Sequence, residues 1–272
     1  MPDLPNDFAK SAYNLVSGDG RKLGGTGFFL GRSMEYFATA RHIVDDNYRD
    51  NKKPYQLIKT LVLYGPIWRQ ENKRENTVFK FSIARWVFDP DDKDLAIAVI
   101  RDPHPVSCRP TPITVHALEN DHNIKIGNDV VYFGYPDGVA NIHHDNLTLV
   151  ARRGILATKY TDDINVPNAL GKSYGLIDSY AQNGFSGSPL WGVTNKYTTV
   201  ETARSIERRK RNERIAAEYS TVPSISRFIF LGLICAHYRT NNDRIDGGHA
   251  GLSYYLKASR INKMISELVP KV

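Results

Sequence analysis

The sequence predicts an all-β fold, a sandwich or a barrel, and two observations support this prediction. Short stretches rich in β-branched and aromatic residues recur along the chain, and Gly, Pro, Asn and Asp separate them. The prolines between residues 101 and 112 indicate an extended connection between two halves. We expect strands over residues 22–30, 35–40, 57–64, 77–87, 115–118, 129–133, 147–152, 154–159, 174–177, 228–236 and 251–256.

The composition is that of a globular protein with a buried core. Of 272 residues, 41% are hydrophobic and 24% are charged, and the net charge of +7 favours acidic partners. Cys108 and Cys235 lie far apart, which suggests a reducing compartment, although they could still pair. The N-terminus lacks the features of a signal peptide, and the longest apolar stretch, 229–236, is too short to span a membrane. We therefore expect a cytoplasmic protein that does not bind membranes.

One glycine-rich turn has the features of a nucleophile loop. Gly184 and Gly187 flank Ser186, and Pro189 follows before an apolar run. Glycine adopts backbone angles that other residues avoid, so this segment predicts a tight, exposed turn. Such a turn can present one hydroxyl and direct backbone N–H groups at a single point, as acyl transfer requires. Taken alone, a turn of this composition is most often without function.

Two earlier stretches give this turn its significance. Thr39-Ala40-Arg41-His42 ends a predicted strand, and Asp94 directly precedes an apolar run that predicts a buried strand. The order His, Asp, Ser differs from the orders in subtilisins and α/β-hydrolases. His42 could also be a half-buried histidine at a strand end, and Asp94 a residue that merely begins a strand.

Five short motifs occur in order along the chain, at residues 26–28, 39–42, 94–96, 134–136 and 184–189. With them the chain resembles the trypsin-like (chymotrypsin-fold) serine peptidases, especially the bacterial HtrA/DegP and glutamyl-endopeptidase groups. The resemblance covers about residues 22–268. It implies two six-stranded antiparallel β-barrels, an N-terminal one in 1–104 and a C-terminal one in 105–272, and a C-terminal helix at 258–269. The family joins the strands around 195–226 by a shorter connection, so this stretch is a helical insertion that departs from the family.

The resemblance assigns a catalytic role to each candidate residue. Ser186 would be the nucleophile of a serine endopeptidase acting on protein or peptide substrates, His42 its general base, and Asp94 the group that orients His42. The N–H groups of Gly184 and Ser186 would form the oxyanion hole. Ser188 is a competing nucleophile, but it lies two residues after the position that the family pattern gives.

No cofactor and no metal are expected. His143 and His144 are adjacent, and adjacent residues of a strand point to opposite faces, so these histidines are expected at the surface rather than around a metal ion.

Phe185 departs from the pattern of the digestive members of the family. Those members carry an aspartate here, which receives the new N-terminus after zymogen cleavage. We therefore expect no activation by N-terminal clipping, and the phenyl ring leaves open whether the oxyanion loop is preformed.

Family spacing also gives a substrate pocket. Tyr180 would form its base, Cys235, Ala236 and His237 one wall, and Gly251 would lie near the other wall. With no acidic residue at the base, a preference for Lys or Arg is disfavoured. Two substrate preferences remain open. The pocket could be shallow and bind a small apolar substrate residue, or a protonated His237 could bind an acidic side chain of the substrate.

The insertion predicts a helix over Glu201–Tyr219, because this stretch lacks Gly and Pro and follows a capping-box pattern at 198–201. Residues 204–214 include six basic residues against two glutamates. Residues 199–218 could be a solvated helix or a docking element for an acidic regulatory protein. A nucleic-acid partner is less favoured, because no aromatic residues are interleaved with the charges.

A terminal amphipathic helix is predicted from the helical spacing of Ile261, Met264, Ile265 and Leu268.

Two other functions remain open besides peptidase activity. The chain could be a peptidase-fold binding module that has lost catalysis, or a nucleic-acid binder that uses the basic helix.

Overall fold

Two closed β-barrels, each of six antiparallel strands, form the protein, which confirms the fold that the family resemblance implies. The computed structural model describes residues 11–16, 22–31, 34–45, 48, 60–68, 74–91, 93–101, 113, 124–136, 149–159, 174–211, 219–237 and 251–268. The predicted boundary between residues 104 and 105 lies outside these ranges, and so does the strand expected at 115–118.

The first barrel has the strand order β1-β2-β3-β6-β5-β4. β1, which the sequence analysis missed, pairs with both β2 and β4 and thereby closes the barrel. It has only four residues, too few for a recognisable alternating pattern. The strands are β1 (Tyr13–Val16), β2 (Lys22–Leu30), β3 (Tyr36–Thr39), β4 (Thr60–Trp68), β5 (Arg74–Phe88) and β6 (Ala96–Ile100).

The second barrel has the strand order β10-β11-β12-β9-β8-β7, and the pairing of β10 with β7 closes it. The separate strands predicted at 147–152 and 154–159 are wrong, because one strand, β8, runs through Gly154. The strands are β7 (Asp129–Gly134), β8 (Val150–Leu156), β9 (Tyr174–Asp178), β10 (Pro189–Glu201), β11 (Tyr219–His237) and β12 (Leu252–Lys257).

Aromatic side chains of β2 join the two barrels. Phe29 fills the first barrel, where its ring meets the edge of Phe37 at a centroid distance of 5.2 Å. Phe28 points to the opposite face of the strand and contacts Phe230 of β11 at 5.4 Å. Phe230 in turn contacts Trp191 of β10 at 5.3 Å. One continuous apolar cluster therefore extends across both barrels.

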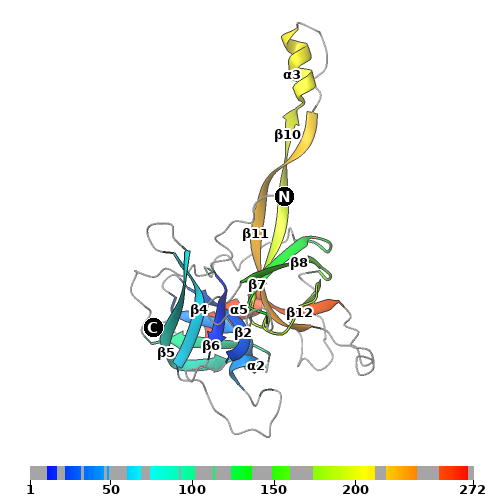
Figure 1. Cartoon of the computed structure of the whole chain (residues 1–272). Coiled ribbons are helices and arrows are strands. Elements are labelled where there is room, and N and C mark those ends of the chain that lie inside the picture. The colour runs from blue at the N-terminus through cyan, green and yellow to red at the C-terminus, as the bar shows by residue number, and fades with distance from the viewer. Residues whose placement is uncertain are drawn as a thin grey trace.

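A long two-stranded arm projects from the second barrel and ends in α3 (Ala203–Lys210) (Figure 1). We call residues 195–226 the arm. β10 and β11 pair with each other from Pro189↔Leu233 out to Glu201↔Tyr219. Beyond Gly192, the pairing that the structure describes for β10 is with β11 alone.

The helix predicted over Glu201–Tyr219 is wrong at both ends, since both of these residues belong to strands. The predicted capping box at 198–201 lies within β10, and the cap is Thr202, whose hydroxyl accepts a hydrogen bond from the Ser205 N–H at 3.2 Å. The β-branched and aromatic residues of 197–200 favour a strand over a helix start. Residues 212–218 lie outside the described ranges.

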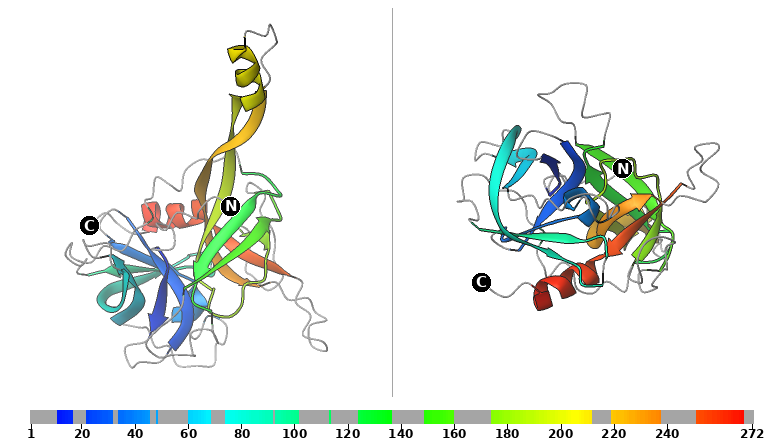
Figure 2. Two further views of the ribbon diagram at one scale, coloured as in Figure 1. Left: turned by 45° about the horizontal axis from the view of Figure 1, so that its top comes forward. Right: turned by 90° about the horizontal axis from the view of Figure 1, so that it is seen from below.

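The C-terminal helix α5 (Ala258–Leu268) lies against the outside of the barrels (Figure 2). It buries Ile261, Met264 and Ile265 in the apolar cluster that extends across both barrels, as their spacing predicts. No helix among the residues that the structure describes has the length and hydropathy to cross a membrane.

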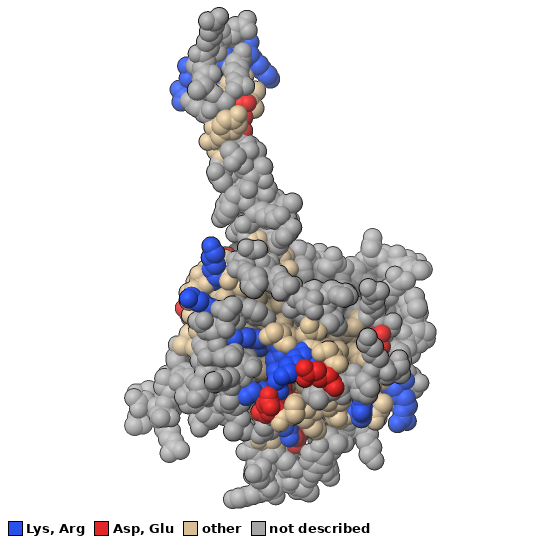
Figure 3. Space-filling view, turned by 180° about the vertical axis from the view of Figure 1, so that it is seen from behind, with Lys and Arg blue, Asp and Glu red and all other residues tan. Residues whose placement is uncertain are grey.

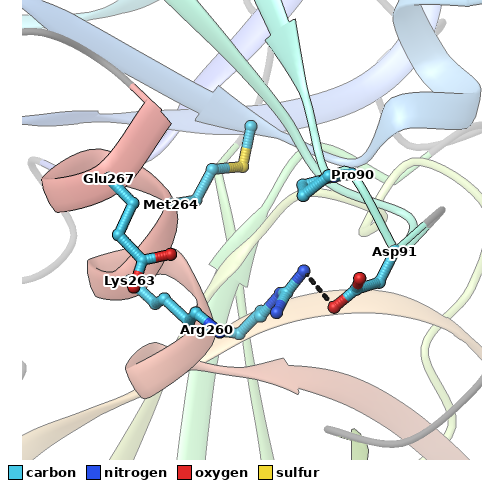
Figure 4. A pocket seen from close by; sticks show the side chains of 6 residues that line it. All are labelled: Pro90, Asp91, Arg260, Lys263, Met264 and Glu267. Carbon is cyan, nitrogen blue, oxygen red and sulfur yellow. Dashed lines mark ion pairs between the residues drawn. The ribbon is translucent and has the colours of Figure 1, made fainter.

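A buried ion pair that the sequence analysis missed attaches α5 to the first barrel. Arg260 donates two hydrogen bonds of 2.6 Å to Asp89, whose side chain is fully buried after β5. Its Nη2 also lies 2.6 Å from Asp91 Oδ2, at a hollow between the helix and the turn (Figure 4). The hydrogen bonds that Arg260 donates to Asp89, followed by the negative charges of Asp89 and Asp91, raise the pKa of the Arg260 guanidinium.

Replacing Arg260 by methionine should destabilise the protein by about 3–5 kcal/mol, because the buried Asp89 carboxylate loses its charged partner. Urea unfolding measures the change. Lys263→Ala, at an exposed position of the same helix, should stay within about 0.5 kcal/mol of wild type. Asp89→Asn combined with Arg260→Met should recover part of the loss; equal losses in the two Arg260 variants would show that Asp89 is not the cause.

Candidate active site

His42 lies in the single turn α2 (Arg41–Val44), and Asp94 holds it at two points. Its Nδ1 is 2.7 Å from Asp94 Oδ2, and its backbone N–H donates to Asp94 Oδ1 at 2.9 Å. Because an ionised carboxylate only accepts hydrogen bonds, Nδ1 carries the proton in this contact. The lone pair of the neutral imidazole therefore lies on Nε2, the nitrogen that faces away from Asp94.

The second barrel supports the position of Asp94. The Asp94 carboxylate is buried, and its backbone N–H donates to the hydroxyl of Tyr174 on β9 at 3.1 Å. Burial, followed by the neighbouring Cys235, raises the pKa of the Tyr174 phenol, which keeps the hydroxyl neutral. No local pattern marks Tyr174, because its partner is 80 residues away in the chain.

Arg41 stabilises the turn that carries His42. Its Nε donates to Asp45 Oδ2 at 2.9 Å, four residues further along the chain. The guanidinium also stacks on two rings, 4.8 Å from the Tyr48 centroid and 4.6 Å from that of Phe88. These contacts join α2 to the end of β5.

The turn before Ser186 has the geometry that its glycine predicts. The Phe185 N–H donates to the Gln182 carbonyl at 3.2 Å, and Gly184, third in this turn, has φ +94°. A positive φ at the third residue is the mark of a type II turn. Within the part of the chain that the structure describes, the N–H groups of Gly184 and Ser186 donate no hydrogen bond.

Backbone hydrogen bonds fix the turn after Ser186 against β11. The Gly187 N–H donates to the Ile234 carbonyl at 2.7 Å, and the Ile234 N–H donates to the Ser188 carbonyl at 2.9 Å. A Cβ on Gly187 would lie 1.8 Å from the Thr26 carbonyl oxygen, so only glycine fits.

A continuous series of contacts connects Ser186 with Asp94 and His42. The Ser186 hydroxyl donates to the carbonyl of Cys235 at 2.9 Å, and the sulfur of Cys235 lies 4.0 Å from the Asp94 carbonyl oxygen. Ser188, the competing nucleophile, is fully buried, and burial argues against it. Cys108, which could have paired with Cys235, lies outside the described residues.

Phe185 anchors the loop in the second barrel. Its side chain is fully buried and meets the ring of Tyr132 edge to face, with centroids 5.1 Å apart. A Cβ on Gly134 would lie 2.7 Å from the Phe185 ring and 2.3 Å from Ser188 Oγ. Gly134 of the Gly-Tyr-Pro motif thus leaves the space that the phenyl ring needs. A buried apolar side chain stands where the digestive members carry an aspartate.

The five predicted pocket residues come from three adjacent elements. Tyr180, half-buried, follows β9, and its carbonyl accepts a hydrogen bond from the Tyr132 hydroxyl at 3.2 Å. Gly251, with φ +71°, precedes β12. Cys235, Ala236 and His237 end β11, next to β12 and beside Ser186. The side chain of His237 lies outside what the structure describes.

No three His, Cys, Asp or Glu side chains gather as a metal site in the described ranges. His143 and His144, the histidine pair considered above, fall outside them.

Two antiparallel six-stranded barrels, with a His–Asp pair from one and a Gly-flanked serine from the other, are consistent with a chymotrypsin-like protein. A family model described as "Trypsin-like peptidase domain" matches residues 25–197. The chain therefore belongs to the trypsin-like peptidase family. No curated protein matches the sequence.

Exchanging Phe185 for aspartate, the residue of the digestive members, should destabilise this protein by about 3–5 kcal/mol, because the new carboxylate would be buried without a partner. Phe185→Leu keeps an apolar anchor and should lose about 1–2 kcal/mol. Urea unfolding of the two variants separates charge from lost volume. An aspartate variant as stable as the leucine variant would refute apolar anchoring of the loop.

Proposed function

We propose that this protein is a serine endopeptidase that cleaves protein or peptide substrates through an acyl-enzyme intermediate on Ser186. The observation that carries the proposal is the 2.7 Å contact between His42 Nδ1 and Asp94 Oδ2 in a trypsin-like peptidase chain. A carboxylate at this position keeps the imidazole in the tautomer that a general base needs.

In the proposed reaction, Ser186 Oγ attacks the carbonyl carbon of the scissile bond while His42 Nε2 takes its proton. The proton then passes to the leaving amine, and the acyl group remains on Ser186 as an ester. A water molecule, activated by His42, hydrolyses the ester and regenerates the serine. Asp94 stays ionised and stabilises the imidazolium throughout.

The present orientation of Ser186 suggests a resting state. Its hydroxyl donates to the Cys235 carbonyl at 2.9 Å. Attack requires the hydroxyl to face His42 Nε2, and a side chain changes between staggered positions by rotation about χ1. We propose that this rotation precedes acylation.

The N–H groups of Gly184 and Ser186 would bind the oxyanion that forms during attack. Both flank Phe185, and in the described part of the chain neither donates to another acceptor. Donors that are already oriented need no rearrangement when charge develops on the substrate oxygen, and each contributes about 10²–10³ to the turnover rate.

For substrate preference, we propose a shallow pocket with Tyr180 at its base and Cys235, Ala236, His237 and Gly251 around it. A small apolar residue would fit this pocket. The alternative, an acidic residue bound by protonated His237, predicts cleavage that weakens as pH rises through the histidine pKa. We also propose that the protein is most similar to the HtrA/DegP and glutamyl-endopeptidase groups, and that it is cytoplasmic. Both proposals rest on sequence features.

A fluorophosphonate probe should label the wild-type protein, because it reacts with an activated serine whatever the natural substrate. Ser186→Ala and His42→Ala should abolish labelling, and Asp94→Asn should slow it by about 10⁴-fold through the wrong imidazole tautomer. Ser188→Ala, which removes a buried hydroxyl nearby, is the matched control and should label as wild type does. Labelling is followed by gel fluorescence.

Folded wild-type protein that resists labelling would favour the second candidate, a catalytically impaired peptidase-fold binding module. The Ser186 hydroxyl on the Cys235 carbonyl is the observation that favours this candidate. Labelling that survives Ser186→Ala would contradict the assigned nucleophile.

We further propose that the arm binds an acidic regulatory protein. Residues 203–211 contain five basic residues and one glutamate. Arg204, Lys210 and Arg211 are exposed, and Lys and Arg side chains gather at the outer end of the arm (Figure 3). A tip of this charge attracts acidic surfaces over about a Debye length.

Shortening the arm should remove partner binding and leave basal labelling unchanged. Because Glu201 and Tyr219 are paired, Asn-Gly in place of residues 202–218 should close the ribbon as a hairpin. We expect wild type, but not this variant or a variant with glutamine at positions 204, 210 and 211, to bind poly-L-glutamate, as measured by fluorescence anisotropy.

Equal binding by the shortened variant would refute a role for the arm. Tighter binding of a single-stranded oligonucleotide than of poly-L-glutamate, with affinity falling steeply with salt, would identify nucleic acid as the partner instead.

A further inference from the structure

Thr26, a fully buried residue of β2, is hydrogen-bonded at every polar group it has. Its N–H donates to the Ser186 carbonyl at 2.8 Å, and its hydroxyl donates to the Gly184 carbonyl at 2.8 Å. The hydroxyl oxygen accepts from the Tyr135 N–H at 3.1 Å, and the carbonyl accepts from the Thr39 hydroxyl at 2.8 Å. Thr26 thus contacts the loop on both sides of Phe185.

The Thr26 hydroxyl holds the peptide unit between Gly184 and Phe185. Its carbonyl end accepts the Thr26 hydroxyl, and its N–H end donates to the Gln182 carbonyl at 3.2 Å. The C=O and N–H of a planar trans peptide point in opposite directions, so two bonds at its ends fix its orientation. The Tyr135 N–H occupies a lone pair of the Thr26 oxygen and leaves the hydroxyl hydrogen for Gly184.

The Thr26 amide holds the peptide unit between Ser186 and Gly187 in the same way. The Ser186 carbonyl accepts the Thr26 N–H at 2.8 Å, and the Gly187 N–H donates to the Ile234 carbonyl at 2.7 Å. Two peptide units of the loop are therefore held at both ends, and Thr26 supplies one bond to each.

The unit between these two carries the Ser186 N–H. Its carbonyl, that of Phe185, accepts the Ser188 N–H at 2.9 Å, so the Ser186 N–H points the opposite way. With both neighbouring units fixed, this N–H has little freedom to turn. The same hydroxyl bond restrains Gly184, whose φ of +94° sets the direction of the other N–H.

We propose that Thr26 is a positioning residue for the oxyanion hole: its hydroxyl holds the N–H groups of Gly184 and Ser186 in the orientation that binds the substrate oxyanion. The inference rests on the proposed function. Through this bond a neutral side chain of the first barrel orients the loop, where the digestive members use an aspartate and a new N-terminus.

The test compares fluorophosphonate labelling rates of Thr26→Val and Thr26→Ser with wild type. Valine keeps the branched shape and the backbone N–H bond but removes the hydroxyl, so we expect labelling about 10–100-fold slower, below the loss of a whole oxyanion donor. Serine restores the hydroxyl and should label within about threefold of wild type. Thr158→Val is the matched control, because it removes another hydroxyl that accepts a backbone N–H, that of Leu176, and it should not slow labelling.

Two further measurements separate positioning from a general structural effect. The pH midpoint of labelling reports the His42 titration and should be the same in Thr26→Val and wild type, because the His42–Asp94 pair is not altered. Hydrogen exchange by mass spectrometry needs no catalysis. Peptides covering residues 182–190 should exchange faster in Thr26→Val than in Thr26→Ser or Thr158→Val. Without the hydrogen bond from the Thr26 hydroxyl, the loop opens more often and exposes the Phe185, Gly187 and Ser188 amides to solvent.

A wild-type labelling rate in Thr26→Val, or unchanged exchange at residues 182–190, would overturn the proposal. A shifted pH midpoint would overturn it too, since the effect would then act through His42. If wild type is not labelled but exchange rises in Thr26→Val alone, the proposed function fails and the hold of Thr26 on the loop stands. If Thr26→Val does not fold, Thr26→Ala, with less bulk in the same space, undergoes the same comparison.

Discussion

The hydrogen bonds between β2 of the first barrel and the Ser186 loop of the second are the interaction on which the site depends. His42 and Asp94 belong to one barrel and Ser186 to the other, so the barrels must keep a fixed register. Thr26 supplies the contacts to the loop. The hydrogen bond from the Asp94 N–H to the Tyr174 hydroxyl joins the barrels beside His42, and the packing of Phe28 against Phe230 joins them through the core. None of these three contacts depends on a charge that titrates near neutral pH.

This arrangement explains how Phe185 replaces the charged residue of the digestive members. A buried aspartate requires a cationic partner, and a new N-terminus is available only after cleavage. A buried phenyl ring requires only a cavity of the right shape, which Gly134 and Tyr132 provide as the chain folds. In this chain the loop therefore has a buried apolar anchor where the digestive members have an ion pair.

The sequence predicts those parts of the fold and site that depend on local chemistry. Glycines at 184 and 187 have the positive φ that a tight turn needs, and the alternating strands close into the expected barrels. Contacts between distant residues left no such signal: Tyr174 is 80 residues from Asp94, and Arg260 is 171 from Asp89. The ends of the helix predicted over Glu201–Tyr219 were wrong for the same reason, because the pairing of Glu201 with Tyr219 in the ribbon left no local pattern.

The proposed regulatory role of the arm is compatible with its geometry. A two-stranded ribbon alone is marginally stable in water, and its outer half has no described neighbour that would fix its direction. A partner bound at the tip would fix the direction of the ribbon. It would thereby shift the conformational equilibrium at the barrel end of the two strands. The two strands of the arm continue into the barrel, β10 from Pro189, three residues after Ser186, and β11 through Cys235, whose carbonyl accepts the Ser186 hydroxyl. The proposed rotation of Ser186 is thus the step that an ordered arm would act upon.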